Sequence, residues 1–278
     1  MLDRRGLLAG SAALLAAGTA RAQGLGQTTD LELTGRFVQG GHAIGRTRPR
    51  ALIFVDGEAL SAASAEGWFI VGFDRDAPGS VQIEARSSGR TASRTLDIAT
   101  GAFPSTRVNG LPPSTVAPTD PALLARIQEE VAIKTEAFAS RIDADGFKDG
   151  FVWPLETYRV TSRWGSQRVL NGTPARPHYG IDLAAPQGSA IRAPAPGRVT
   201  LARPGMHFEG GLVLIDHGQG LITAYLHQSR IEVRQGQDVL RGDLIGRVGM
   251  TGRATGPHLC WRGKWRDRNI DPSLLVKT

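Results

Sequence analysis

Short apolar runs, each long enough for one β-strand, recur along most of this chain and are separated by turn-forming residues. From residue 31 to about residue 100 they alternate with polar residues, as expected for strands with one buried face. These runs are LELTGRFV, ALIFVDGE, GWFIVGF, SVQIEA and RTLDIA. Glycine, at 35 of 278 residues, is costly inside helices, which argues against a helical bundle. We predict a mostly β chain whose first unit, residues 23–102, is a small β-sandwich.

The predicted sandwich contains no cluster of histidine, cysteine and carboxylate side chains that suggests chemistry. His42 follows the Gly40–Gly41 pair, and we expect it to be exposed in a turn. We interpret this unit as a spacer or a recognition module.

Residues 103–150 differ from the segments on either side. Their first part is rich in proline and predicts a stiff extended linker over residues 103–118. A helix follows, with Asp120 placed to cap it and Pro121 suited to its first turn. Its expected apolar stripe consists of Leu124, Ile127, Val131, Phe138 and Ile142. Residues 151–278 return to short apolar runs and predict a compact all-β domain.

The first 22 residues have the pattern of an export signal. Arg4 and Arg5 precede an apolar stretch, and a small-x-small site ends at Ala22. The arginine pair favours a twin-arginine signal, with an ordinary secretory signal as the alternative. We expect a periplasmic or otherwise exported protein with no integral membrane segment in the mature chain. Residues 1–22 carry a net charge of +2, so the rest of the chain has 7 − 2 = +5. This excess suits an anionic partner such as a cell wall, with simple solubility as the alternative. No run of basic and aromatic residues indicates nucleic-acid binding.

Two short motifs in the last domain combine metal-binding side chains. Side chains two or four residues apart share one face of a strand, so His178 and Asp182 are expected to point the same way, as are His258 and Cys260. If the two strands are neighbours, an imidazole, a carboxylate and a thiolate converge. Three such ligands with one open position are typical of catalytic zinc sites. The alternative is isolated polar residues on an exposed face.

The order of motifs resembles one family. The segments PHYGIDLAAPQGSAIRAPAPGRV, VLIDHGQGLITAYLHQS and GDLIGRVGMTGRATGPHLCW are similar to those of the lysostaphin-type (LytM-type) zinc endopeptidases, which cut peptidoglycan cross-links. The resemblance covers most of residues 151–275. It implies an antiparallel β domain of the duplicated hybrid motif type, with a zinc groove across one sheet. It also implies that Zn²⁺ is the cofactor and that peptidoglycan peptides are the substrate.

The resemblance also assigns roles to single residues. His178 and Asp182 match the first two zinc ligands, and His227 and His258 match the catalytic histidines that do not bind the metal. His217 matches a structural turn. His207 matches no motif and is expected at the surface or the groove rim, while Tyr225 shares the face of His227 by strand spacing and is expected to pack or touch substrate.

Cys260 departs from the family pattern, which has a histidine ligand at this position. A thiolate could hold zinc there, the site could have lost its metal, or Cys260 could act as a nucleophile. Ligand chemistry favours Cys260 as the third metal ligand, in a neutral site that activates water less strongly. We therefore predict an exported zinc metalloendopeptidase that hydrolyses peptidoglycan cross-links with a zinc-activated water. The alternative is an inactive domain that binds murein or activates a separate cell-wall hydrolase.

Overall fold

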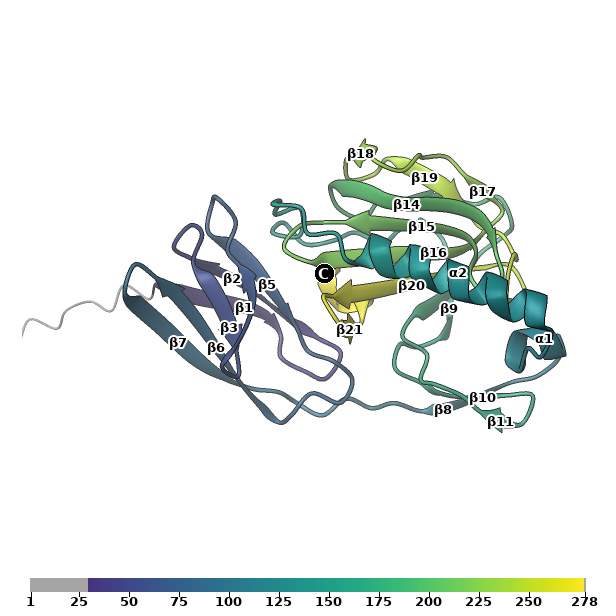
Figure 1. Ribbon diagram of the computed structural model, residues 1–278, viewed down its shortest axis with the longest axis horizontal. Helices are drawn as coiled ribbons and strands as arrows, with labels where there is room; N and C mark the ends of the chain where they lie inside the picture. The colour runs from purple at the N-terminus through teal and green to yellow at the C-terminus, as the bar shows by residue number, and fades with distance from the viewer. Residues whose placement is uncertain (1–29, 278) are drawn as a thin grey trace, which may run out of the picture.

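The computed structural model describes residues 30–277, so the predicted export signal lies outside the described residues. The first unit holds two antiparallel sheets, ordered β1-β2-β5 and β4-β3-β6-β7 (Figure 1). The strands are β1 (Leu31–Arg36), β2 (His42–Thr47), β3 (Leu52–Val55), β4 (Glu58–Ala62), β5 (Trp68–Gly72), β6 (Ser80–Ser87) and β7 (Arg90–Asp97). Buried side chains of both sheets, such as Ile53 and Phe69, share one apolar core, as in a β-sandwich.

His42 corrects one expectation. It is the first residue of β2 and only 4 % exposed, because the chain re-enters the sheet directly after the Gly40–Gly41 turn. Burial, assisted by the charge of Arg36, lowers the pKa of His42 to about 4.

The proline-rich segment is not a free linker. Its strand β8 (Ser105–Val108) pairs in parallel with β10 (Gln167–Leu170) of the last domain, and β10 also pairs with β11 (Thr173–Pro174). A single helical turn, α1 (Pro113–Val116), follows. This segment is therefore built into the side of the last domain.

Helix α2 (Pro121–Phe138) begins as predicted, because the Asp120 carboxylate accepts a hydrogen bond from the Leu123 amide at 3.1 Å. The predicted apolar stripe is confirmed at Phe138, which packs against the core, but most of it is wrong. Leu124 is 39 % exposed and Val131 50 % exposed, and the helix ends before Ile142. The helix instead packs through Ala137 and its neighbours Ile133 and Phe138.

The last domain is built on an antiparallel sheet ordered β18-β14-β15-β16-β20-β12-β9, with β21 paired to β20. Its strands are β9 (Arg159–Ser162), β12 (Ile181–Ala184), β14 (Gly197–Met206), β15 (Gly210–Asp216), β16 (Leu221–Gln228), β18 (Asp238–Val239), β20 (His258–Trp265) and β21 (Arg268–Ile270). A smaller sheet joins β13 (Ala190–Arg192), β19 (Leu244–Arg247) and β17 (Arg230–Ile231). A 3₁₀ turn, Pro272–Leu275, follows β21.

The two faces of the large sheet are covered differently. One face carries Tyr225, Trp261 and the main apolar core. The other face carries Leu212, Leu214 and Cys260 and is partly covered by α2, which crosses β14, β15 and β16 in Figure 1. Because the helix covers only part of this face, the rest of it is available for a groove.

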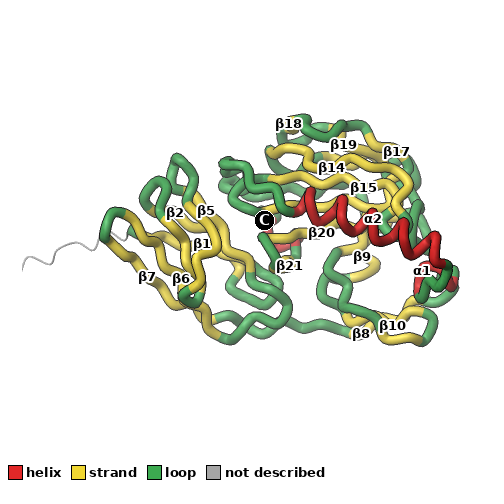
Figure 2. The backbone as a smooth tube through the Cα atoms, in the orientation of Figure 1, coloured by secondary structure: helices red, strands yellow, loops and turns green. Residues whose placement is uncertain are grey.

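The sandwich and the last domain are in direct contact. Asn269 donates a backbone hydrogen bond to the Asp74 carboxylate at 2.9 Å, and Arg75 Nε donates to the Gly165 carbonyl at 2.9 Å. Figure 2 shows strands and loops dominating, with helix limited to α1, α2 and the short turn after β21 in the described part. The prediction of a mostly β chain is confirmed. No helix among residues 30–277 is long and apolar enough to span a membrane.

Candidate metal centre

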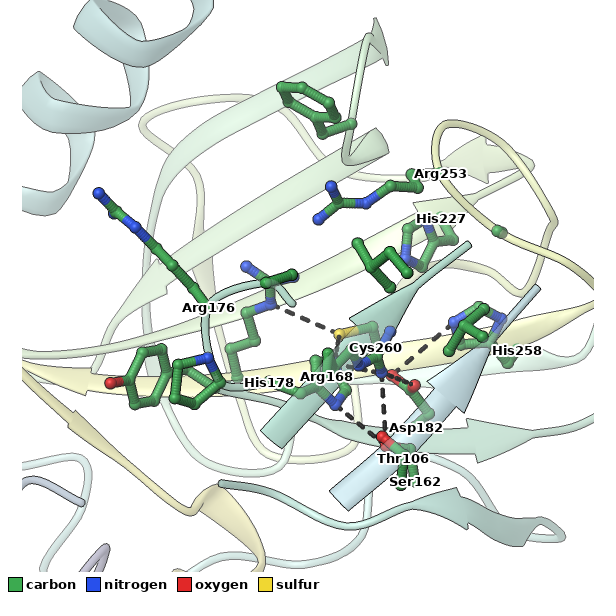
Figure 3. A pocket seen from close by; sticks show the side chains of 18 of the residues that line it. Thr106, Ser162, Arg168, Arg176, His178, Asp182, His227, Arg253, His258 and Cys260 are labelled. Carbon is green, nitrogen blue, oxygen red and sulfur yellow. Dashed lines mark hydrogen bonds and ion pairs between the residues drawn. The ribbon is translucent and has the colours of Figure 1, made fainter. Parts of the chain in front are cut away.

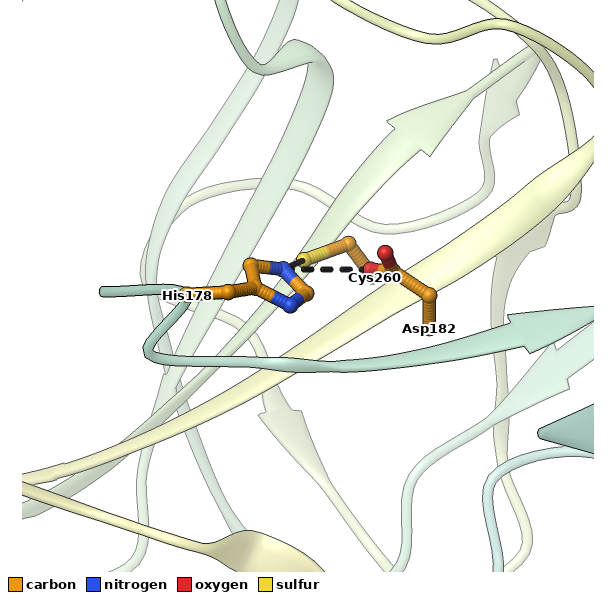
Figure 4. Close-up of side chains that lie close together, drawn as sticks. All are labelled: His178, Asp182 and Cys260. Atoms are coloured by element: carbon orange, nitrogen blue, oxygen red, sulfur yellow. Dashed lines mark hydrogen bonds and ion pairs between the residues drawn. The ribbon is translucent and has the colours of Figure 1, made fainter. Parts of the chain in front are cut away.

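His178, Asp182 and Cys260 converge on one point, with one potential ligand atom from each lying within 4.8 Å of the others (Figure 4). Asp182 on β12 is the direct cross-strand partner of Cys260 on β20. His178 Nε2 lies 3.3 Å from Cys260 Sγ and 3.2 Å from Asp182 Oδ1. The prediction that His178 stands on the strand is wrong, because β12 begins at Ile181. The loop before the strand nevertheless turns its ring toward the carboxylate.

The donor set fits a zinc ion. Zinc bonds of about 2.0 to 2.3 Å place donors in a tetrahedron about 3.3 to 3.8 Å apart, close to the two distances from His178. Asp182 Oδ1 is buried and has no hydrogen-bond partner among the described residues, as expected for an atom that awaits a metal. All three residues are at least 92 % buried. Imidazole, carboxylate and thiolate are all zinc ligands.

Gly180 makes this convergence possible. A Cβ atom at this position would lie 2.8 Å from Cys260 Sγ, 2.9 Å from Arg262 Cγ and 3.2 Å from His178 Nε2. The space between the donor atoms is therefore preserved by the absence of a side chain.

A second layer of side chains orients the donors. His178 Nδ1 lies 3.3 Å from Ser162 Oγ; when Nδ1 donates this bond, Nε2 keeps its lone pair toward the site. Arg168 Nη2 donates to Asp182 Oδ2 at 2.6 Å, which leaves Oδ1 free. Arg262 Nε donates to Cys260 Sγ at 3.4 Å, so a guanidinium faces the sulfur.

The protonation of the donors follows from burial and charge. Burial lowers the pKa of His178 to about 4 despite the charge of Asp182, so the imidazole is neutral at neutral pH, as a ligand must be. Burial opposes ionisation of Asp182, but the charges of His178 and Arg168 hold its pKa well below its usual range. Burial raises the pKa of Cys260 to about 12. Without a metal Cys260 is therefore a thiol, which argues against the nucleophile hypothesis, and zinc binding must release its proton.

His227 and His258 stand beside the three donors, with ring centroids 4.7 Å apart. His227 Nδ1 is 2.8 Å from the Thr251 carbonyl, and His258 Nδ1 is 2.8 Å from the Gly256 carbonyl. A carbonyl only accepts, so both rings carry their proton on Nδ1 and keep the Nε2 lone pair free. His258 Nε2 is 3.8 Å from Asp182 Oδ1.

The backbone of His227 has φ = 66°, a left-handed conformation that is uncommon for residues other than glycine. This interrupts the strand alternation, so Tyr225 and His227 do not share a face as predicted. Tyr225 is fully buried in the main core, whereas His227 lines a cavity that opens over the three donors. Backbone strain of this kind concentrates at functional sites.

The remaining histidines lie apart from the donors. Buried His217 donates from Nδ1 to the Pro196 carbonyl at 2.7 Å and accepts at Nε2 from Thr223 Oγ1 at 2.7 Å, which in turn contacts Tyr225. His217 thus has the fold-stabilising position that the resemblance implied. His207 is partly exposed, with Nε2 3.1 Å from the Ser114 carbonyl.

A cavity of about 910 Å³ opens over the donors. Figure 3 shows His178, Asp182 and Cys260 on its wall, together with His227, His258 and several arginines. Thr106, Arg107 and Val108 of the proline-rich segment also line it. Sequence reasoning did not identify Arg168 or Arg262. Strand spacing could have identified Arg262, because it lies two residues after Cys260 on the same face of β20. In contrast, no local pattern around Arg168 indicates its contact with Asp182.

Comparison with known proteins places this geometry in a family. Residues 176–272 match peptidase family M23. The chain is 40 % identical over 127 residues to the DD-carboxypeptidase/endopeptidase Mpg of Neisseria meningitidis serogroup B, covering 45 % of this chain and 29 % of the relative. It is 39 % identical over 121 residues to the peptidoglycan DD-endopeptidase ShyA of Vibrio cholerae, covering 43 % and 28 %. The chain thus spans less than a third of the length of these curated relatives.

A crystal structure assigned as a peptidase M23 from Pseudomonas aeruginosa resembles most of the molecule. Its TM-score is 0.67 at 29 % identity, covering 87 % of this chain and 95 % of the other. Residues 176–272 are therefore a peptidase family M23 domain of the LytM type, which confirms the resemblance drawn from the motifs. This segment contains all three donors and both neighbouring histidines.

Proposed function

We propose that the protein is an exported zinc metalloendopeptidase that hydrolyses peptide bonds in peptidoglycan cross-links. The observation that carries the proposal is the buried triad of His178, Asp182 and Cys260, with ligand atoms within 4.8 Å of one another in an M23 domain. Relatives such as the DD-endopeptidase ShyA support peptidoglycan as the substrate. The motif at residues 1–22 supports export to the periplasm or cell wall.

In this proposal His178, Asp182 and Cys260 hold the metal. A zinc ion bound there would polarise the scissile carbonyl and make a water molecule more acidic. His227 and His258 line the same space, so they can orient the attacking water. Burial lowers the pKa of His227 to about 3, so its neutral ring accepts a hydrogen bond from the water but is a weak proton acceptor. We therefore assign the proton transfer from the water to the leaving amine to His258.

The alternative is an inactive domain that binds murein or activates a separate hydrolase. The observation that favours it is Cys260 itself, because this buried thiol is protonated unless a metal binds. A site that failed to take up zinc would keep its shape through the contacts of Arg168 and Arg262.

The test combines metal content with turnover. The purified chain is analysed for zinc and assayed on cross-linked muropeptides, before and after treatment with a chelator and after zinc is restored. We expect about one zinc per chain and cleavage that is lost with the chelator and regained with zinc. Asp182→Asn should lower both zinc content and cleavage. Cleavage that survives complete metal removal, or a zinc-replete protein that never cleaves, would contradict the proposal.

A further inference from the structure

The cavity around the donor site carries an excess of positive charge. Two acidic side chains line it, Asp182 and Glu209, against six cationic ones. The cationic residues are Arg107, Arg168, Arg176, Arg253, Arg262 and Lys264. An anionic ligand would therefore experience a favourable field throughout the cavity.

Both acidic side chains already have partners. Asp182 is paired with Arg168, and Glu209 with Lys134. Consequently Arg168 is the one cationic lining residue that forms an ion pair with a carboxylate within residues 30–277. Of the other five cations, Arg262 donates to Cys260 Sγ, and none forms an ion pair with a carboxylate among the described residues.

Arg253 is the best positioned of these five. Its Nη1 donates to the Thr115 carbonyl at 3.1 Å, and its guanidinium lies 4.9 Å from the ring centroid of Phe208. Burial lowers the pKa of Arg253, and the charges of Arg262 and Arg168 lower it further. The guanidinium is thus held beside other cations and forms no ion pair within residues 30–277, although the charge of nearby Glu209 partly offsets them. An anion would relieve this arrangement.

Arg107 and Arg176 add charge from another part of the cavity. Arg107 lies on β8 and Arg176 precedes His178, and both residues are exposed. Figure 3 shows Arg176 and Arg253 among the side chains that line the cavity, each carried by a different segment. A peptide that reached the donor site would therefore pass several guanidinium groups, some partly buried and some exposed.

We propose that this cationic cavity selects peptides that carry a free carboxylate near the scissile bond, and that Arg253 is a specificity-determining residue. This inference rests on the proposed endopeptidase function and narrows its substrate class to anionic peptides. A carboxylate matches the fork of guanidinium donors, whereas the corresponding carboxamide lacks the charge and one acceptor atom.

The test uses the zinc-loaded full chain and two synthetic cross-linked peptides that differ only in one carboxylate or carboxamide beside the scissile bond. We expect kcat/KM to be about tenfold or more higher for the carboxylate, from charge-assisted hydrogen bonding. Arg253→Gln should reduce this ratio to below about threefold, and Arg253→Lys should retain part of it. A purely structural effect of either substitution would lower both rates and leave their ratio unchanged.

Arg234→Gln is the matched control, because Arg234 is exposed between β17 and β18 and does not line the cavity. Its rates and ratio should equal those of the unmodified chain. Equal kcat/KM for the two peptides would overturn the inference.

If neither peptide is cleaved, the proposed hydrolysis fails, and the binding of fluorescent forms of both peptides decides the inference separately. Tighter binding of the carboxylate form that disappears in Arg253→Gln supports the inference. Equal affinity for the two forms overturns it.

Discussion

The substitution Gly180→Ala separates the packing of the donor site from its chemistry. It adds one methyl group and changes none of the proposed ligand residues. The φ angle of Gly180 is not in the left-handed region, so alanine meets no backbone penalty there. The new Cβ would lie 2.8 Å from Cys260 Sγ and 3.2 Å from His178 Nε2, so these donor atoms must move apart.

The size of the effect follows from these contacts. Overpacking of this kind costs about 1 to 3 kcal/mol, and about 1.4 kcal/mol corresponds to a factor of ten in affinity. Because the displaced atoms are the proposed ligands, the cost falls largely on metal binding. We expect zinc affinity to decrease by roughly 5- to 150-fold.

The assay is a competition titration against a chelating indicator of known zinc affinity. Gly79→Ala is the control, because a Cβ at Gly79 meets nothing within 4 Å, and it should bind zinc like the unmodified chain. Thermal unfolding of the metal-free proteins verifies that Gly180→Ala is folded. Unchanged zinc affinity in folded Gly180→Ala would refute the argument that Gly180 keeps the metal position open.

Three further predictions concern single side chains. Cys260→His should maintain or raise turnover, because a neutral ligand leaves the metal a stronger Lewis acid; complete loss of cleavage with zinc still bound would count against this reasoning. The pKa of His42 is lowered to about 4 in the folded state from 6.5, so the unfolded chain binds the extra proton and stability falls as pH drops from about 6.5 to about 4. This residue contributes at most about 1.4 kcal/mol per pH unit, and denaturant titrations of His42→Asn should show a correspondingly shallower decline; identical slopes would exclude that contribution. His217→Ala removes the partner of the Pro196 carbonyl and one of the two partners of the buried Thr223 hydroxyl. Calorimetry should show a melting temperature lower by roughly 5 to 15 °C, whereas an unchanged value would show that His217 does not stabilise the fold.

Local rules were sufficient for several features. Strand alternation places His258 and Cys260 on one face of β20, and both line the cavity. The cap of α2 at Asp120 also follows from local chemistry. That β12 and β20 are neighbours followed from the family resemblance and not from a local rule, since the pairing of Asp182 with Cys260 joins residues far apart in sequence.

Other features depend on contacts that no local pattern contains. Most of the stripe predicted on α2 is wrong, because the helix covers only part of the sheet and meets it through Ala137 and Phe138. His42 is buried because the sandwich closes over the start of β2. The left-handed backbone of His227 breaks the alternation that had grouped it with Tyr225. Arg168 reaches Asp182 although β10 and β12 belong to different sheets, so only the folded domain brings the two side chains together.

The central claim is that a cysteine sulfur acts as a ligand in a zinc site of a LytM-type domain. Anomalous diffraction from zinc-replete crystals, recorded on both sides of the zinc absorption edge, tests it most directly. The account predicts one strong peak bonded to His178 Nε2, an Asp182 oxygen and Cys260 Sγ, with the sulfur at about 2.3 Å. Zinc-replete crystals with no anomalous peak among these three side chains would contradict it.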